Sequence, residues 1–219
     1  MAQLVGLIRV NEGIVLGADC GTFEIDSNII KINDAVVALA VDDFKSGASL
    51  CGKISSSLGT GGFEEAIGSA VKILTDPKNP FMSKVITLLF AGYDQLGREK
   101  DHFVIKFDGT KITSENPLQI DVVFSSDDTL ARYLCHKVLT RSMPLEQALT
   151  LMAYILMQYN QILQTGRNIS LATISEKGFK MLDHDETRQV IHEAEKKSTD
   201  IKRGSYDILT KKFNMERRE

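Results

Sequence analysis

EGIVLGADCGTF, residues 12–23, follows a short apolar run at the start of the chain. Two hydrophobic segments, 3–10 and 13–18, flank Asn11-Glu12-Gly13, a pattern typical of a β-hairpin. Neither segment alternates cleanly between apolar and polar residues, which indicates strands that are covered on both faces. The second segment ends on Asp19. A carboxylate at that point is either a solvent-exposed strand end or part of a catalytic or structural ion pair.

Composition excludes several classes of protein. The chain has 219 residues, of which 43% are hydrophobic and 25% charged, with a formal net charge of −3. It is long enough for a substantial core, and its charge gives no argument for nucleic acid as a partner. We see no signal peptide and no apolar run near the roughly 20 residues that cross a bilayer. We therefore expect a cytoplasmic protein without a nucleic-acid or membrane partner.

The cysteines and the absence of metal-binding motifs bear on the compartment and on cofactors. Three widely spaced cysteines fit a reducing compartment better than a disulfide framework. The chain has no HExxH and no CxxC, so we expect no metal and no other cofactor.

The hydrophobic period changes in blocks along the chain. Strands, two helices, strands, two helices and strands follow one another, and a strongly charged tail comes last. Blocks of this kind exclude a regular βαβ alternation and predict sheets inside with helix pairs outside. The predicted strands are 3–10, 13–18, 28–32, 35–41, 85–93, 102–107, 111–113, 120–124, 169–175 and 179–182, and the predicted helices are 44–58, 63–74, 130–139 and 145–159.

A collinear set of short motifs resembles the proteasome β-type N-terminal-nucleophile (Ntn) hydrolases. The set comprises GIVLGAD at 13–19, a lysine before a second hairpin, LLFAGYD at 88–94, a strand with a DG turn, and MPLEQAL at 143–149. The resemblance spans roughly residues 2–183. It implies an α+β fold, a four-layer α-β-β-α sandwich of two antiparallel sheets between helix pairs. Residues 1–183 would form this domain, and 184–219 a charged helical or partly disordered C-terminal tail.

The resemblance also implies a site. In this family a threonine at the mature N-terminus attacks the peptide carbonyl, and an aspartate and a lysine complete the site. Asp19 matches the aspartate, Lys31 the lysine, and Ser126 could stand in for a supporting serine. We expect the head groups of Asp19 and Lys31 to lie within about 4 Å of each other. The position of the nucleophile carries Ala2, which has no hydroxyl.

Other positions also depart from the family pattern. Asp42 or Asp43 stands where a glycine near the oxyanion hole is expected, and a carboxylate there would oppose the developing charge. The glycines around Ser126 are missing, and Ile162 or Leu163 replaces an aspartate near the end of the long helix. These departures favour a non-catalytic subunit that self-assembles as a homo-oligomer or with ring partners. The alternative is a threonine-type peptidase or amidohydrolase, acting on a peptide or protein, whose nucleophile has been replaced.

Cys20 could in principle supply the missing nucleophile, since it follows Asp19 directly. A cysteine nucleophile needs a neighbour that favours the thiolate, and a nearby carboxylate does the opposite. We expect Cys20 to be a packed or half-buried thiol. Cys51 and Cys135 lie on apolar helix faces, so we expect both in the core.

Overall fold

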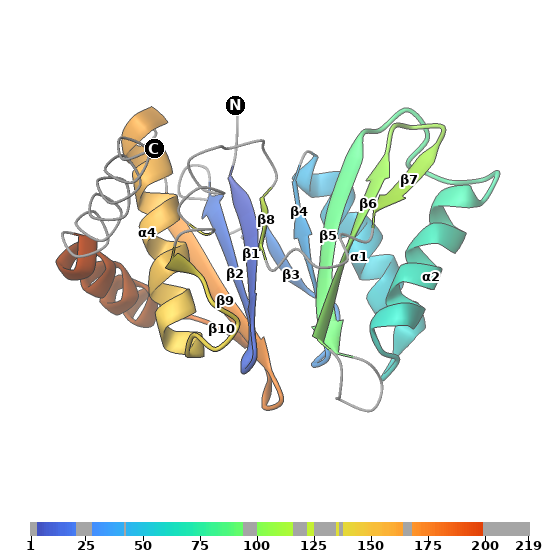
Figure 1. Ribbon diagram of the computed structural model, residues 1–219. Helices are drawn as coiled ribbons and strands as arrows, with labels where there is room; N and C mark the ends of the chain where they lie inside the picture. The colour runs from blue at the N-terminus through green and yellow to red at the C-terminus, as the bar shows by residue number, and fades with distance from the viewer. Residues whose placement is uncertain are drawn as a thin grey trace, which may run out of the picture.

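A computed structural model describes residues 4–20, 28–41, 43–93, 100–115, 122–124, 135, 138–163 and 168–198. Two β-sheets face each other, and helices lie on their outer sides (Figure 1). The prediction of an α+β fold with two antiparallel sheets is confirmed. Within these ranges no helix combines the length and the hydropathy that crossing a membrane requires.

The first sheet has the strand order β10-β9-β2-β1-β8, and every neighbouring pair is antiparallel. β2 is its central strand and pairs along its whole length with β9. Because Asp19 pairs with Ile169 and Cys20 with Asn168, the strand does not end on Asp19 as predicted. The strands are β1 (Val5–Val10), β2 (Gly13–Cys20), β8 (Val122–Phe124), β9 (Asn168–Ser175) and β10 (Gly178–Met181).

The second sheet has the order β3-β4-β5-β6-β7, again antiparallel throughout. The predicted turn at Asn33-Asp34 joins β3 to β4. Asn33 Oδ1 accepts hydrogen bonds from the N–H groups of Ala35 (2.9 Å) and Val36 (2.8 Å), which is how asparagine stabilises tight turns. The strands are β3 (Ile29–Lys31), β4 (Val36–Ala40), β5 (Ile86–Tyr93), β6 (Lys100–Phe107) and β7 (Ile112–Glu115).

Three of the helices pack on the outer faces of the sheets. α1 (Phe44–Leu58) and α2 (Phe63–Thr75) lie on the second sheet, and α4 (Leu145–Leu163) lies on the first. The predicted helix at 130–139 falls largely outside the described residues, although Cys135 and Val138 are helical.

The core has three apolar layers, because successive side chains of a strand point to opposite faces. One layer, which includes Leu7, Leu16 and Leu89, lies between the sheets. The other two lie between each sheet and its helices. Both faces of the central strands are buried, which explains the unbroken apolar runs in the sequence. Cys51 and Cys135 are buried as predicted, and burial raises the pKa of both thiols to about 12.

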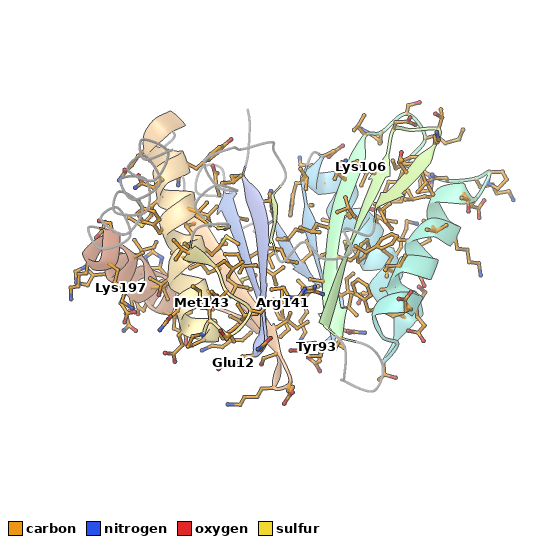
Figure 2. The ribbon with its side chains drawn as sticks, in the orientation of Figure 1. Glu12, Tyr93, Lys106, Arg141, Met143 and Lys197 are labelled. Atoms are coloured by element: carbon orange, nitrogen blue, oxygen red, sulfur yellow. The ribbon has the colours of Figure 1, made fainter. Side chains whose placement is uncertain are left out.

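The turn between β1 and β2 anchors the start of α4. Glu12 Oε2 accepts a hydrogen bond from the N–H of Leu145 at 2.9 Å, and the Asn11 N–H donates to the Arg141 carbonyl at 2.8 Å. A carboxylate at a helix N-terminus satisfies a free N–H and interacts favourably with the helix dipole. Glu12 and Arg141 are both labelled in Figure 2, at the lower end of the molecule.

Residues 184–198 form a further helix beside α4. Ala194 is fully buried in the same apolar cluster as Met152 and Leu156 of α4, and Val190 and Ile191 pack against that cluster. The length and apolar content of α4 therefore have an explanation within the chain. One side of α4 packs on the first sheet, and the helix at 184–198 packs beside α4 in the same apolar cluster.

Candidate functional site

The candidate site lies at the end of the first sheet where β1 begins and β2 and β8 end. Strand register fixes this, because Val5 pairs with Ala18 and Gly6 pairs with Phe124. In Figure 1 it is the upper end, near the mark for the N-terminus. Ala2 and Ser126 lie outside the described residues, each two positions beyond a described one.

Asp19 is the predicted site residue that the structure describes at this end. Its N–H donates a hydrogen bond to the Leu4 carbonyl at 2.9 Å, so it lies beside the beginning of the chain. Asp19 is 0% exposed. It takes part in a further hydrogen bond, ion pair or electrostatic interaction, while its Oδ2 atom has no hydrogen-bond partner among the described residues. The reading of Asp19 as a solvent-exposed strand end is therefore wrong. A buried carboxylate is tolerated in a protein when it is paired.

Lys31 does not lie at this end, so the predicted pair with Asp19 is not formed. The Lys31 ammonium is 2.6 Å from Asp34 Oδ1 and 5.9 Å from the centre of the Phe179 ring. Register connects Phe179 through Ile174 to Ile14. Ile14 precedes Asp19 by five residues of β2, which is about 16 Å along a strand. The short hairpin turn after β3 holds Lys31 near the opposite end of the sandwich.

Lys31 instead bridges the edges of the two sheets at the lower end. β3 is an edge strand of one sheet and β10 of the other, and Lys31 contacts Phe179 of β10 across the gap. Tyr93, at the lower end of β5, is buried nearby (Figure 2). Burial, and to a lesser degree the charge of Glu176, raises its pKa to about 12. These contacts indicate a structural role for Lys31, which remains half exposed.

Sequence reasoning missed Asn28, which immediately precedes β3. Asn28 is 3% exposed, and its carbonyl accepts a hydrogen bond from the Ala40 N–H at 2.9 Å. Its side-chain Nδ2 has no hydrogen-bond partner among the described residues. β3 runs from Asn28 toward Lys31, so the end of β3 nearer the candidate site carries an amide and not a cation. One asparagine before an apolar run gives no signal in the sequence that would have identified it.

Asp43 caps the N-terminus of α1 through its side chain. It is the N-cap residue, and its carboxylate accepts hydrogen bonds from the Ser46 N–H (3.1 Å) and the Ser46 hydroxyl (2.8 Å). The Lys84 ammonium is 3.8 Å away. The Ser46 hydrogen bonds are the main reason why the pKa of Asp43 lies below its ordinary value. A helix N-terminus is a natural site for an anion, and here the protein's own carboxylate occupies it.

Replacing Asp43 with alanine should lower the free energy of unfolding by about 1 kcal/mol near neutral pH, because a helix N-cap is lost. Since the folded-state pKa is depressed, the stabilisation by the ionised carboxylate is present above the ordinary pKa and is lost as pH falls through the folded pKa. Urea unfolding at pH 6 and pH 3 measures the effect. The difference between wild type and Asp43→Ala should shrink at the lower pH.

Asp43→Asn is the matched control for that experiment. Asparagine is an equally good N-cap but has no carboxyl group to titrate. Its stability relative to Asp43→Ala should stay nearly constant between the two pH values. A wild-type advantage over Asp43→Ala that does not change with pH would contradict the assigned role of the ionised carboxylate.

The remaining predicted positions add little to the site. Cys20 belongs to β2, and its side chain lies outside the described residues, as does Asp42. Ile162 and Leu163 belong to the last turn of α4. Among the described residues no group of histidine, cysteine or carboxylate side chains is placed to hold a metal ion.

Fold and site together define an α+β protein with two antiparallel sheets, outer helices, and a buried aspartate at the strand ends beside the start of the chain. No protein-family model matches the sequence, and no relative was found among the curated proteins.

Proposed function

We propose that the chain is a non-catalytic, self-assembling subunit with the four-layer α-β-β-α fold of the proteasome-like Ntn hydrolases. Two features support the fold assignment. The two antiparallel sheets pack face to face, and α1 and α2 cover one while α4 covers the other. The buried Asp19 lies next to Leu4, where the family has its aspartate beside the start of the chain.

The placement of Asp43 is the observation that carries the non-catalytic part of the proposal. Acyl transfer requires donors that are directed at the developing oxyanion. The N–H of Ser46 at the start of α1 is instead engaged by the Asp43 carboxylate. A second negative charge at this position would be repelled. The distance of Lys31 from Asp19 removes the cation that the reaction needs, and Ala2 removes the hydroxyl.

A peptidase assay on the full-length chain tests this proposal. We expect no cleavage of a panel of fluorogenic peptides, either by the wild-type chain or by Ala2→Thr. Restoring the hydroxyl should be insufficient, because Asp43 and the position of Lys31 are unchanged. Cleavage by Ala2→Thr that a threonine-directed covalent inhibitor abolishes would favour the alternative, a peptidase whose nucleophile has been replaced. Inhibitor-sensitive cleavage by the wild type would contradict the proposal outright.

Self-association is the second testable part. Light scattering at micromolar concentration should give a mass several times the 24.3 kDa of one chain. Closed symmetry is expected, because a heterologous contact that does not close builds filaments. A monomer at every concentration would leave the proposed fold standing and remove the case for a proteasome-like assembly.

A further inference from the structure

The helix at 184–198 is attached to the domain by a narrow seam. Its inward positions follow a spacing of three and four residues, at Thr187, Val190, Ile191 and Ala194. Thr187 and Ala194 are buried, whereas Val190 and Ile191 are only partly covered. The other side chains of this helix are mostly exposed and charged. A single apolar stripe of this kind buries much less surface than α4 does.

Crevices separate this helix from the domain on both flanks. One, of about 360 Å³, is lined by Leu145 and Leu149 of α4 and by Gln189 and Glu193. The other, of about 290 Å³, is lined by residues including Ile169 of β9 and Arg188. Both crevices are open to solvent. The helix therefore covers the surface of α4 and β9 beneath it only in part.

The link between the helix and the sheet is short. The Leu182 N–H donates to the Leu171 carbonyl at 3.0 Å, and the remaining contacts of the link are polar and exposed. β10 ends at Met181 and the helix begins at 184, so two residues form the connection. Asp183 and Glu186 cap the helix reciprocally, with distances of 2.8 and 3.1 Å. The Lys180 ammonium lies 2.5 Å from Glu186 Oε1, and both side chains are more than a third exposed. Exposed ion pairs contribute little to stability and are weakened by salt.

We infer that the helix at 184–198 detaches as a unit and exchanges between two copies of the chain, so that each copy covers the other's α4. This inference rests on the self-association proposed above and names the surface that carries it. Detachment exposes Leu149, Leu182 and their neighbours, a groove suited to an amphipathic helix with a seam of three- and four-residue spacing. The helix at 184–198 fits this groove, and a second copy of the chain carries the same helix. Exchange of an identical element is a low-cost route to a dimer, and short hinges favour it.

Hydrogen exchange on the full-length chain tests the detachment. Amides at 188–198 should exchange faster than those of β5 or of the middle of α4, and with a weaker dependence on denaturant, as expected for a unit that opens before the rest. Glu186→Gln should raise the exchange rate of this helix about two- to five-fold, because it removes the ion pair and keeps a residue suited to the capping box. Glu195→Gln is the control, since Glu195 lies on the same helix and contacts His192 at 3.8 Å. Equal protection of the helix and β5 would contradict detachment, and no effect of Glu186→Gln would contradict a contribution of the ion pair to holding the helix.

Isotope-mixed cross-linking tests the exchange itself. Full-length chains in ¹⁴N and ¹⁵N form are mixed at high concentration, warmed below the melting temperature and cooled. Oligomers are then separated from monomers and treated with a zero-length carbodiimide, which should join Lys180 to Glu186 at their ion pair. Exchanged oligomers should contain mixed-isotope Lys180–Glu186 links in the proportion of random pairing, and monomers only same-isotope links. Oligomers with only same-isotope links would overturn the exchange and leave the proposed function intact, whereas the absence of oligomers would overturn both.

Discussion

Asp19→Ala is expected to lower the free energy of unfolding by about 3 kcal/mol, a large part of the 5–15 kcal/mol typical of a domain. Asp19 is completely buried, so truncation at Cβ leaves a cavity, and any interaction that the carboxylate makes is lost with it. The backbone hydrogen bond from its N–H to the Leu4 carbonyl does not depend on the side chain and should persist. The loss should therefore reflect the carboxylate and not the strand.

Urea unfolding at neutral pH measures this loss, and Asp19→Asn is the matched control. Asparagine keeps the volume and one acceptor oxygen, so its effect should be clearly smaller than that of alanine. If alanine costs less than about 0.5 kcal/mol, the range of an ordinary surface substitution, the carboxylate does not hold this end of the sheet together. If the chain is non-catalytic, as we propose, its buried aspartate needs a structural reason, and this experiment tests whether it has one.

The order of strands and helices could be predicted because it depends on local periodicity. Helices α1, α2 and α4 begin at the predicted residues, since Asp43 caps one and Pro144 precedes another. The two sheets could be predicted from the blocks of strands. The extension of β2 through Asp19 to Cys20 could not, because it depends on pairing with β9, which is about 150 residues away in the sequence.

The geometry of the site was less accessible from the sequence. Asp19 could be selected because a carboxylate at the end of an apolar run is unusual. The resemblance predicts Lys31 as the partner of Asp19, but the length of β3 and the tight turn at Asn33 decide which end of the sandwich Lys31 reaches. The burial of Asn28 depends on contacts between the sheets. Such contacts leave no periodic signal in a single sequence.

Gly92→Ala is expected to lower the free energy of unfolding by about 2–3 kcal/mol, through overpacking in the core. A Cβ at this position would lie 2.5 Å from the Ala35 carbonyl oxygen and 3.3 Å from Val36 Cα. Both are backbone atoms of the adjoining turn and strand, and Val36 is the register partner of Gly92. Rotation of a side chain cannot relieve these contacts. The backbone of β4 would have to move, and with it the hydrogen bond from the Tyr93 N–H to the Ala35 carbonyl.

Gly68→Ala provides a control with the same chemical change and the opposite expected sign. Gly68 lies within α2, and a Cβ there would meet no heavy atom within 4 Å. Alanine should therefore raise stability by about 0.5–1 kcal/mol, because glycine is a poor helix former. In thermal melts, the melting temperature of Gly92→Ala should lie below that of wild type and the melting temperature of Gly68→Ala above it. If Gly92→Ala melts at or above the wild-type temperature, the close approach of β4 and β5 is not as tight as described. If it melts well below the wild-type temperature, close packing of β4 against β5 explains why residue 92 is a glycine.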